Sequence, residues 1–313
     1  MPEPSFIGID LGGTQLRVAA ARLDGTMLDR RHATTDRLGG PQAVVAQMEA
    51  LVGAVRQRDT VAIGIGVPGA FDGEKGMVLD IPALPGWNSV PLEKILSDRT
   101  GLTVILENDA KVAALGEWRA GGGKGFSNFA YVTVSTGIGG GIVAEGRMIR
   151  GFRGLAGEVG HTRITDHSAV CSCGRQGCWE AVASGTALAR AAKAAIEKAP
   201  SSLLAKVAGE DAPTGEHVSR AAREKCPAAL AILSIEAEWL AAGFANIQHL
   251  YSPQRIVLGG GVSKALDLMH PQIVRSMEER ILSGHPVPEI VRAELGDDAG
   301  LIGAAYRASE TQD

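Results

Sequence analysis

The sequence predicts an α/β protein with two duplicated domains and a cleft between them. Over residues 6–21 a short apolar strand enters a glycine-rich turn and a second strand leaves it, and the same pattern recurs over residues 130–146. Two such strand–turn–strand units indicate internal duplication. Between them amphipathic helices alternate with buried strands, and a chain of 313 residues is long enough for two domains.

Composition excludes several classes of function. The formal net charge of -4 favours neither nucleic acid nor an anionic membrane as a partner. We expect no apolar run as long as a membrane span, and the N-terminus has no signal-peptide pattern. Four cysteines, three of them in one cluster, fit a reducing cytoplasm better than a disulfide framework. The expected protein is cytoplasmic and has small-molecule partners.

The two glycine-rich turns, Asp10–Thr14 and Ser135–Gly141, are candidates for binding an anion. Each offers backbone N–H groups and a threonine hydroxyl, although a single such turn is more often only a tight hairpin. Two of them favour a nucleotide triphosphate held between the domains, with Asp10 contacting a magnesium ion directly or through water. The Gly137-x-Gly139 string is followed by a strand rather than a helix, so we reject a dinucleotide-binding interpretation.

The chain between the two turns alternates helix and strand. The patterns predict a helix over residues 41–56, a buried strand over 61–67, and a strand over 102–106 followed by a helix over 110–119. The GGGKG run at 121–125 marks the crossing from the first domain to the second.

Asn108 and Asp109 stand where the 102–106 strand passes into the next helix. Such a junction lies at the edge of a sheet, where α/β proteins bind ligands. Both residues also suit plain helix capping. Beside a phosphate cradle and a pair of carboxylates held near a metal, Asp109 becomes a candidate general base.

Residues 155–180 contain a candidate metal site. His161, Cys171, Cys173 and Cys178 can supply the four N/S ligands of a tetrahedral structural zinc. The glycines among the cysteines allow the backbone to fold tightly around one ion. The alternative is a loop with free thiols.

Two carboxylates flank the candidate ligands. Glu158 precedes His161 by three residues, and Glu180 follows Cys178 by two. A metal would hold both carboxylates rigidly, which suits the binding of a polyhydroxylated ligand. Taken singly, either glutamate fits a solvated surface charge.

The rest of the chain is predicted to be mainly helical. A glycine-rich strand end at Gly259–Gly261 allows a planar base or ribose to approach the backbone closely. The predicted elements are helices over 184–198, 216–225 and 228–251, a loop-rich excursion over 199–215, a strand over 255–258, a helix over 262–269 and a terminal helix beginning within 296–305.

These motifs together resemble the ROK family (repressors, open reading frames and sugar kinases) of the actin-like ATPase-domain superfamily. The resemblance covers essentially the whole chain, and the cysteine motif is its most specific part. The matching motifs, in order, are DLGGT at 10–14, VPG at 67–69, END at 107–109, STGIGGG at 135–141, GEVGH at 157–161, CSCGRQGCWE at 171–180 and VLGGG at 257–261.

The resemblance implies ATP-dependent phosphorylation of a hexose hydroxyl, with ATP, Mg²⁺ and a structural Zn²⁺ as cofactors. It implies two ribonuclease-H-like domains that close over a cleft. The first would span 1–119 together with the C-terminal helix 298–313, and the second would span 120–297 and carry the zinc motif. A homodimer is also expected, since dimers are common in the family and the long 228–251 helix is apolar.

The resemblance also implies roles for single residues, with Asp109 as the catalytic base. The residues that would contact sugar hydroxyls are Gly69, Asn108, Asp109, Glu158, His161 and Glu180. The residues that would hold zinc are His161, Cys171, Cys173 and Cys178. The residues that would bind the nucleotide are Asp10, Gly12, Gly13, Thr14, Thr136, Gly137, Gly260 and Gly261.

Alternatives to this function are kept open. Relatives that are sugar-responsive repressors carry a helix-turn-helix domain before DLGGT, whereas only nine residues precede Asp10 here and no basic patch stands out. A non-catalytic, zinc-stabilised sugar binder is the second alternative, which the presence of Asp109 opposes. The 6-hydroxyl of glucose is the expected acceptor, with N-acetylmannosamine, fructose, mannose and allose as alternatives, because pocket shape decides between hexoses.

Overall fold

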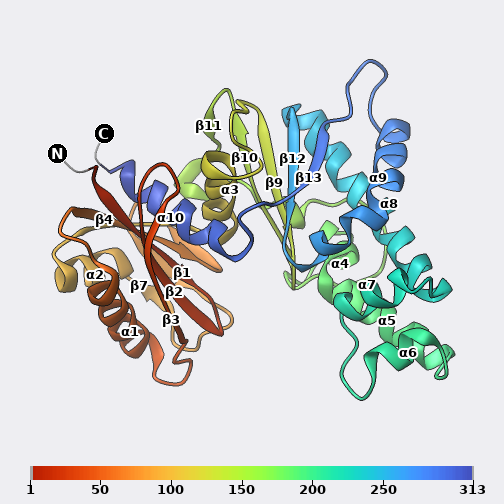
Figure 1. Cartoon of the computed structure of the whole chain (residues 1–313), viewed down its shortest axis with the longest axis horizontal. Helices are drawn as coiled ribbons and strands as arrows, with labels where there is room; N and C mark the ends of the chain where they lie inside the picture. The colour runs from red at the N-terminus through yellow and green to blue at the C-terminus, as the bar shows by residue number, and fades with distance from the viewer. Residues whose placement is uncertain (1–2, 312–313) are drawn as a thin grey trace. The chain divides into compact units, whose positions relative to one another are not determined.

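The computed structural model describes residues 3–311, which form two compact units (Figure 1). Unit 1 consists of the residues up to Gly125, Met148–Gly157 and the residues from Glu294 onward, and unit 2 consists of Phe126–Arg147 and Glu158–Ala293. The segment Met148–Gly157, expected within the second domain, groups with unit 1. Residues 1–2 and 312–313 of the expected first domain lie outside the described residues.

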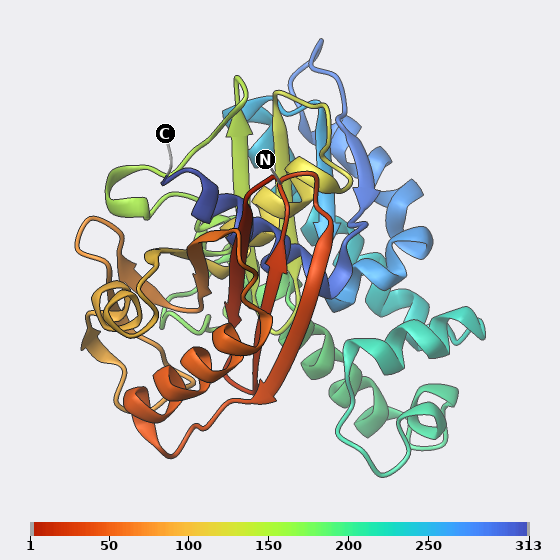
Figure 2. The same cartoon turned by 60° about the vertical axis from the view of Figure 1, so that its left-hand side comes forward.

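Unit 1 is built on a five-stranded mixed sheet in the order β3-β2-β1-β4-β8. β2 is antiparallel to β1 and β3, while β1, β4 and β8 are parallel to one another. In Figure 2 the first three strands lie side by side in red to orange. The elements are β1 (Ser5–Leu11), β2 (Gln15–Ala21), β3 (Met27–Thr34), α1 (Gly40–Val55), β4 (Thr60–Val67), β5 (Ala70–Asp72), β6 (Met77–Asp80), β7 (Asn88–Val90), α2 (Leu92–Thr100), β8 (Thr103–Asn108), α3 (Asp109–Ala120), the 3-10 helices η1 (Phe152–Gly154) and η4 (Gly296–Asp298), and α10 (Ala299–Ser309).

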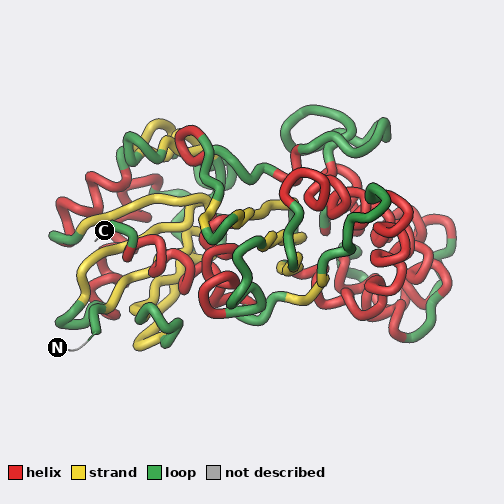
Figure 3. The backbone as a smooth tube through the Cα atoms, turned by 90° about the horizontal axis from the view of Figure 1, so that it is seen from above, coloured by secondary structure: helices red, strands yellow, loops and turns green. Residues whose placement is uncertain are grey.

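Unit 2 repeats this sheet, in the order β11-β10-β9-β12-β13. β9 is antiparallel to β10 and parallel to β12, which is parallel to β13. Helices predominate in the rest of the unit, as the red segments of Figure 3 show. The elements are β9 (Phe129–Val134), β10 (Ile138–Ala144), β11 (Arg147–Met148), η2 (Val159–His161), α4 (Trp179–Ala183), α5 (Gly185–Lys198), α6 (Leu203–Ala208), α7 (Gly215–Arg223), α8 (Pro227–Tyr251), β12 (Arg255–Gly259), η3 (Gly261–Ala265), α9 (Leu266–Arg280) and β13 (Glu289–Arg292).

The shared strand order confirms the predicted duplicated α/β fold. Each unit begins with an antiparallel hairpin, β1–β2 or β9–β10, at the two places where the sequence predicts a strand–turn–strand unit. In each unit the first strand of the hairpin then pairs in parallel with a later strand. The parallel pairing needs a crossover, and α1 supplies a helical one between β3 and β4.

The two faces of the unit 1 sheet are covered differently. Ile7, Ile9, Ile63 and Ile65 point into the large apolar core that also contains buried side chains of α1 and α2. The opposite face carries glycine in both central strands, and α10 packs directly on it. A Cβ at Gly8 or Gly64 would overlap carbonyl oxygens of α10.

Small residues also bring α10 against α3. A Cβ at Gly303 would overlap the carbonyl oxygen of Val112 in α3, and one at Gly116 would overlap that of Ala299. The two helix backbones therefore approach more closely than any larger side chain permits. The terminal helix, expected to return to the first domain, does pack within unit 1.

The structure differs from the sequence predictions at three elements. The excursion expected to be loop-rich contains α6, which Ser202 caps by accepting a hydrogen bond from the N–H of Ala205. The helix expected to end at Met269 continues through Pro271 to Arg280, because burial of Ile273 and Met277 outweighs the one backbone bond that proline removes. The short sheet β5-β6-β7 was not predicted, because its strands are too short to show periodicity.

The expectation of no run as long as a membrane span also needs correction. α8 is long and apolar enough, by length and composition alone, to cross a membrane. Half of its apolar window is buried inside the structure, where it packs against α4, α5, α7 and α9. Core helices of globular proteins have the same composition.

The close approach of α10 and α3 can be tested with Gly303→Ala. We expect the free energy of unfolding to fall by about 1–3 kcal/mol, because the added methyl forces two packed backbones apart. The matched control is Gly53→Ala in α1, where a Cβ meets no atom within 4 Å. The control should raise stability by about 0.5–1 kcal/mol, since alanine is the better helix former. Urea denaturation compares the stability of the two variants. Equal denaturation midpoints would contradict the packing argument.

Candidate active site

The carboxyl ends of three parallel strands bring the predicted unit 1 residues to one edge of the sheet. Asp10 of β1 is in register with Gly66 of β4, which is in register with Glu107 of β8. The chain beyond β4 reaches Gly69, and the chain beyond β8 reaches Asp109. Ligands of α/β proteins bind at such an edge.

Asp10 is a partly buried carboxylate close to Arg17. Burial raises the pKa of its carboxyl, an effect that Arg17 opposes and Asp297 reinforces. The Arg17 Nη1 atom lies 3.5 Å from Asp10 Oδ2, and Gly300 lies next to the same carboxyl group. A carboxylate held out of water is stabilised by a nearby cation, which here is Arg17. The contact of Asp10 with Mg²⁺ stays a prediction.

The turn after β1 is closed by backbone hydrogen bonds. The N–H of Gly12 donates to the carbonyl oxygen of Gln15 at 2.9 Å, and the Thr35 hydroxyl donates to the carbonyl oxygen of Gly12 at 2.8 Å. A Cβ at Gly13 would lie 2.7 Å from that of Ala83. Thr14, at the end of the turn, is exposed. The turn is therefore tight and presents its threonine outward.

Asn108 and Asp109 take different places at the start of α3. The Asn108 side-chain oxygen caps the helix by accepting from the N–H groups of Ala110 at 3.0 Å and Lys111 at 3.2 Å. Asp109 is the first helical residue, and its Oδ1 accepts from the N–H of Ala110 at 2.7 Å. The capping interpretation thus applies to Asn108. A carboxylate in the first turn also interacts favourably with the helix dipole.

Gly69 has a left-handed backbone that any other residue would adopt with strain. Its φ is +95°, and a Cβ there would lie close to the carbonyl oxygen of Asp80. The turn after β4 therefore requires glycine.

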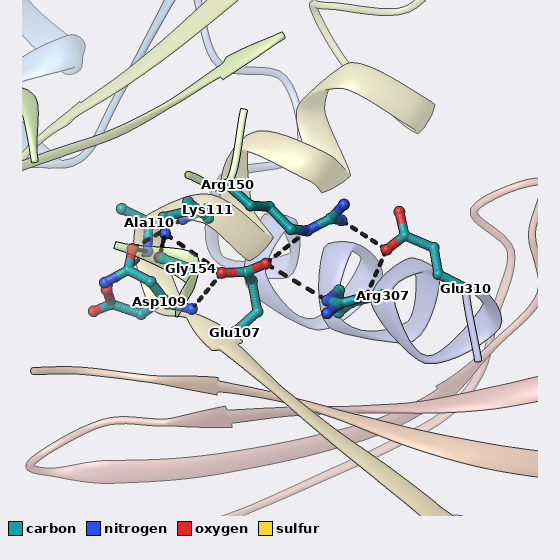
Figure 4. Close-up of polar contacts among 9 residues, drawn as sticks. Glu107, Asp109, Ala110, Lys111, Arg150, Gly154, Arg307 and Glu310 are labelled. Atoms are coloured by element: carbon teal, nitrogen blue, oxygen red, sulfur yellow. Dashed lines mark hydrogen bonds and ion pairs between the residues drawn. The ribbon is translucent and has the colours of Figure 1, made fainter. Parts of the chain in front are cut away.

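A buried ion-pair network is centred on the residue that precedes Asn108 and Asp109, and sequence analysis missed it (Figure 4). Glu107, with only 3% of its surface exposed, is its centre. The carboxylate accepts a hydrogen bond from Arg150 Nε at 3.0 Å and lies 3.5 Å from Arg307 Nε and 3.6 Å from Lys111 Nζ. The i, i+4 spacing of Glu107 and Lys111 could have suggested that pair.

Glu310 joins the network from α10's end. Its Oε2 accepts hydrogen bonds from Arg150 Nη2 at 2.6 Å and from Arg307 Nη1 at 2.7 Å. Burial alone would lower the pKa of the Arg150 guanidinium, but the Glu310 and Glu107 carboxylates raise it above its usual value. Arg150 therefore stays charged.

In unit 2 the four predicted zinc ligands come together. The ligand atoms of His161, Cys171, Cys173 and Cys178 all lie within 4.8 Å of one another. Cys173 Sγ lies 3.7 Å from Cys178 Sγ, and Cys171 Sγ lies 3.5 Å from His161 Nδ1. Burial raises the pKa of the Cys171 thiol to about 12, so a bound metal would have to displace its proton.

These separations match a tetrahedral zinc site. Zn–S bonds near 2.3 Å and Zn–N bonds near 2.05 Å give tetrahedral edges of about 3.8 Å between two sulfurs and about 3.6 Å between sulfur and nitrogen. The residues therefore fit zinc in number, type and spacing. His161 turns Nδ1 toward Cys171 Sγ, which puts Nε2 on the other side of its ring.

Backbone geometry positions the cysteines. Gly174 and Gly177 both have positive φ, at 81° and 82°, which only glycine adopts without strain. The N–H of Cys171 donates to the carbonyl oxygen of Arg175 at 2.8 Å, and the N–H of Ile164 donates to that of Gly177 at 2.9 Å. The cysteine loop is thereby fixed to the strand-like chain that follows His161.

Glu158 and His161 lie one turn apart on a 3-10 helix. Glu158 is exposed and is the N-cap of η2, and His161 is the last residue of η2. Side chains three residues apart project from the same side of a 3-10 helix. A Cβ at Gly160 would overlap the carbonyl oxygen of Ile138, so glycine allows η2 to lie on β10.

Glu180 connects the cysteine loop with the turn between β9 and β10. Its Oε2 accepts from the N–H of Ile138 at 3.0 Å, and its Oε1 accepts from the Ser172 hydroxyl at 2.6 Å and faces Cys171 Sγ at 3.3 Å. Gly137 packs against the same carboxylate. Its predicted contact with a sugar stays a prediction; the structure adds a role in holding the turn.

A cavity of about 360 Å³ opens in unit 2 beside that turn. Hydrogen bonds fix the turn to α5: the N–H of Gly185 donates to the carbonyl oxygen of Ser135 at 2.7 Å, and the Thr186 hydroxyl donates to that of Thr136 at 2.8 Å. The first residues of α5, α7 and η3 contribute to the wall. The lining residues are Ser135, Thr136, Gly185, Thr186, Ala189, Thr214, Gly215, Glu216, Ser219, Gly261, Val262 and Lys264.

Three helix N-termini therefore converge on this cavity, and such termini favour anions. Sequence analysis predicted nucleotide contacts at Thr136 and Gly261 and a helix over residues 216–225, but it did not assign the start of that helix to the same site. Thr214, followed three residues later by His217, forms a capping box that could have located the helix start. Gly260 adjoins the cavity at a positive φ of 76°.

A second cavity of about 250 Å³ shares Thr136 and Thr186 with the first. Cys171, Ser172 and Glu180 of the cysteine-loop region line its other side. The turn between β9 and β10 thus separates a cavity at the helix N-termini from one at the candidate zinc site.

Comparison with known proteins identifies relatives along the whole chain. The ROK family model matches residues 6–311. The glucokinase of Streptomyces coelicolor is 38% identical over 311 residues, 97% of each chain, and an N-acetylmannosamine kinase of Escherichia coli is 34% identical over 305 residues, 96% of this chain and 97% of the relative. A crystal structure of a ROK family glucokinase from Streptomyces griseus, in complex with glucose and AMPPNP, has 35% identity and a TM-score of 0.84 and covers 98% of this chain and 99% of that one.

The candidate zinc site predicts a metal-dependent effect of Cys173→Ser. Protein purified under reducing conditions should contain about one zinc ion per chain, and the variant should lose most of it with one thiolate ligand removed. Sugar binding should weaken more than nucleotide binding, because Glu158 and Glu180 flank the metal. Cys226→Ser is the matched control: Cys226 is buried outside the cluster, at the N-cap of α8, where serine is favourable. Elemental analysis measures the zinc content of each protein. A wild type that contains no zinc would contradict the proposed metal site.

Proposed function

The chain belongs to the ROK family, and on that premise we propose that it is an ATP-dependent sugar kinase that phosphorylates the 6-hydroxyl of glucose. The observation that carries the proposal is the unit 2 cavity, whose wall includes the Ser135–Thr136 turn and three helix N-termini. Glucokinases are among the relatives that align with nearly the full chain.

The nucleotide is proposed to occupy this cavity. Backbone N–H groups at the starts of α5, α7 and η3 suit its phosphates, and Gly260–Gly261 allows adenosine to approach the backbone. Thr136 and Gly137 belong to the phosphate-binding turn. In unit 1, the Gly12–Thr14 turn is the second phosphate-binding candidate, and Asp10 would hold Mg²⁺, which neutralises charge developing on the phosphoryl group when bound.

The sugar is proposed to be bound by the carboxylates and the histidine at matching family positions. Glu158 and His161 Nε2 offer an acceptor and a second polar partner on one side of η2. Glu180, Gly69 and Asn108 complete the proposed contacts. Zinc on His161 Nδ1 and the three cysteines would be structural and would fix η2 beside the cysteine loop.

Asp109 is proposed as the general base. Its carboxylate accepts the proton of the sugar hydroxyl while the hydroxyl oxygen forms a bond to the γ-phosphorus and the bond to the ADP oxygen breaks. The capping of α3 by Asn108 leaves Asp109 the first helical residue, so the base does not also have to act as the N-cap. Positioning and charge stabilisation supply the rest of the rate.

The experiment that tests the proposal is a coupled ADP-release assay with purified protein, ATP and a panel of sugars. Glucose should give the highest kcat/KM, and N-acetylmannosamine, mannose, fructose and allose are the competing acceptors. N-acetylmannosamine is the second candidate, because kinases for that sugar are also relatives over almost the whole chain. ATP turnover with no member of the panel would contradict a hexose kinase.

Assembly and location complete the proposal. We propose a homodimer, since α8 exposes Leu230, Ile235, Leu250 and Tyr251 on its surface, although scattered apolar residues also occur on monomers. We propose a cytoplasmic location from the four unpaired cysteines.

The proposed base predicts the effect of Asp109→Asn. The change keeps shape and removes basicity, so kcat should fall by roughly 10²-fold or more while the fold persists. The matched control is Asp24→Asn in the exposed turn between β2 and β3, which should leave kcat unchanged. Steady-state kinetics with the best sugar compares kcat of the two variants with that of the wild type. Thermal unfolding of each variant checks that the fold persists. A near-wild-type kcat in Asp109→Asn would show that the residue has only a helix-terminal role.

A further inference from the structure

The segment Met148–Gly157 has an unusual place in the chain. It belongs to unit 1, although the residues directly before and after it belong to unit 2. The next residue along the chain is Glu158, a proposed sugar contact. Whatever fixes the segment on unit 1 therefore fixes the backbone that enters Glu158.

Several polar contacts attach this segment to unit 1, including an ion pair of Arg153 with Glu74, and two of the attachments reach the buried carboxylate of Glu107. Arg150 donates from Nε to Glu107 Oε2 at 3.0 Å and from Nη2 to Glu310 Oε2 at 2.6 Å. Lys111 Nζ donates to the carbonyl oxygen of Gly154. Lys111 is itself 2% exposed and paired with Glu107, so both attachments end on the same buried carboxylate.

The same carboxylate also faces the junction that carries the proposed base. Glu107 immediately precedes Asn108, and its Oε1 accepts from the Asn108 N–H at 3.1 Å. In Figure 4 Glu107 lies between Asp109 and Lys111 on one side and the two arginines on the other. The carboxylate thus touches the β8–α3 junction and the segment leading to Glu158 at once.

We propose that Arg150 is a positioning residue for the sugar: through Glu107 it fixes the segment that leads to Glu158 against the junction that carries Asp109. Arg150 does not itself touch the reacting atoms. The inference rests on the proposed function, because it takes Glu158 as a sugar contact and Asp109 as the base. It predicts that replacing Arg150 weakens sugar binding, and not only the stability that its salt bridges provide.

Arg307 provides a matched control within the same network. It lies 3.5 Å from Glu107 and donates to Glu310 at 2.7 Å, so it pairs with the same two carboxylates as Arg150. It comes from α10, which contains no proposed sugar contact. Replacing either arginine removes one positive charge from the same network, but of the two arginines only Arg150 belongs to the segment Met148–Gly157.

The experiment compares Arg150→Met, Arg150→Lys and Arg307→Met with the wild type, using steady-state kinetics, calorimetric binding of the sugar and thermal unfolding. In Arg150→Met we expect kcat/KM for the sugar to fall by roughly 10- to 100-fold, mainly through KM, because misplacement of a contacting group costs about this much. KM for ATP should change by less than about 2-fold. Arg150→Lys should recover part of the sugar affinity, since lysine keeps one charged donor.

Arg307→Met should lower the unfolding temperature about as much as Arg150→Met but leave sugar affinity within about 2-fold, since losing either arginine removes one partner of the same buried carboxylate. Unchanged sugar affinity in Arg150→Met, or equal losses in both methionine variants, would overturn the positioning role while the wild type still phosphorylates sugar. A wild type that neither binds nor phosphorylates a sugar would instead overturn the proposed function, and this inference with it.

Discussion

The buried carboxylate of Glu107 is the interaction on which the organisation of unit 1 depends. Strand β8 provides this carboxylate, and helix α3, the segment Met148–Gly157 and helix α10 each contribute a cationic side chain to it. Two of these cations, Arg150 and Arg307, also pair with Glu310. A buried charge is tolerable only when it is paired and hydrogen-bonded, and the loss of one partner is strongly destabilising. Four separate parts of the chain are consequently held in one arrangement around the residue that precedes Asn108 and Asp109.

Close backbone packing provides the second constraint. Gly8, Gly64 and Gly303 leave no room for a side chain where α10 meets the sheet and α3. The terminal helix therefore sits directly on the sheet, and its end carries Arg307 and Glu310 into the ion-pair network. Packing and electrostatics are thus coupled in unit 1.

Unit 2 uses a carboxylate in a comparable way, although this one lies in helix α4 and not in a strand of the sheet. Glu180 joins the β9–β10 turn to the cysteine loop through hydrogen bonds from Ile138 and Ser172. The proposed phosphate-binding turn and the candidate zinc site therefore share one side chain. Zinc at the cysteines would restrain the loop and, with it, one face of that turn.

The sequence by itself determined the duplicated α/β fold and the glycine turns, and it predicted the four candidate zinc ligands that the structure brings together, because local spacing and periodicity encode these features. It made Asp109 a candidate general base through the strand–helix junction that presents the residue. Only the tertiary structure decided that Arg150, Arg307 and Glu310 meet at Glu107, because these residues lie 43 to 203 positions from Glu107 in the sequence and no local pattern links them. The residues of α7 in the unit 2 cavity were likewise decided by packing, since three helix starts converge there only after the chain has folded.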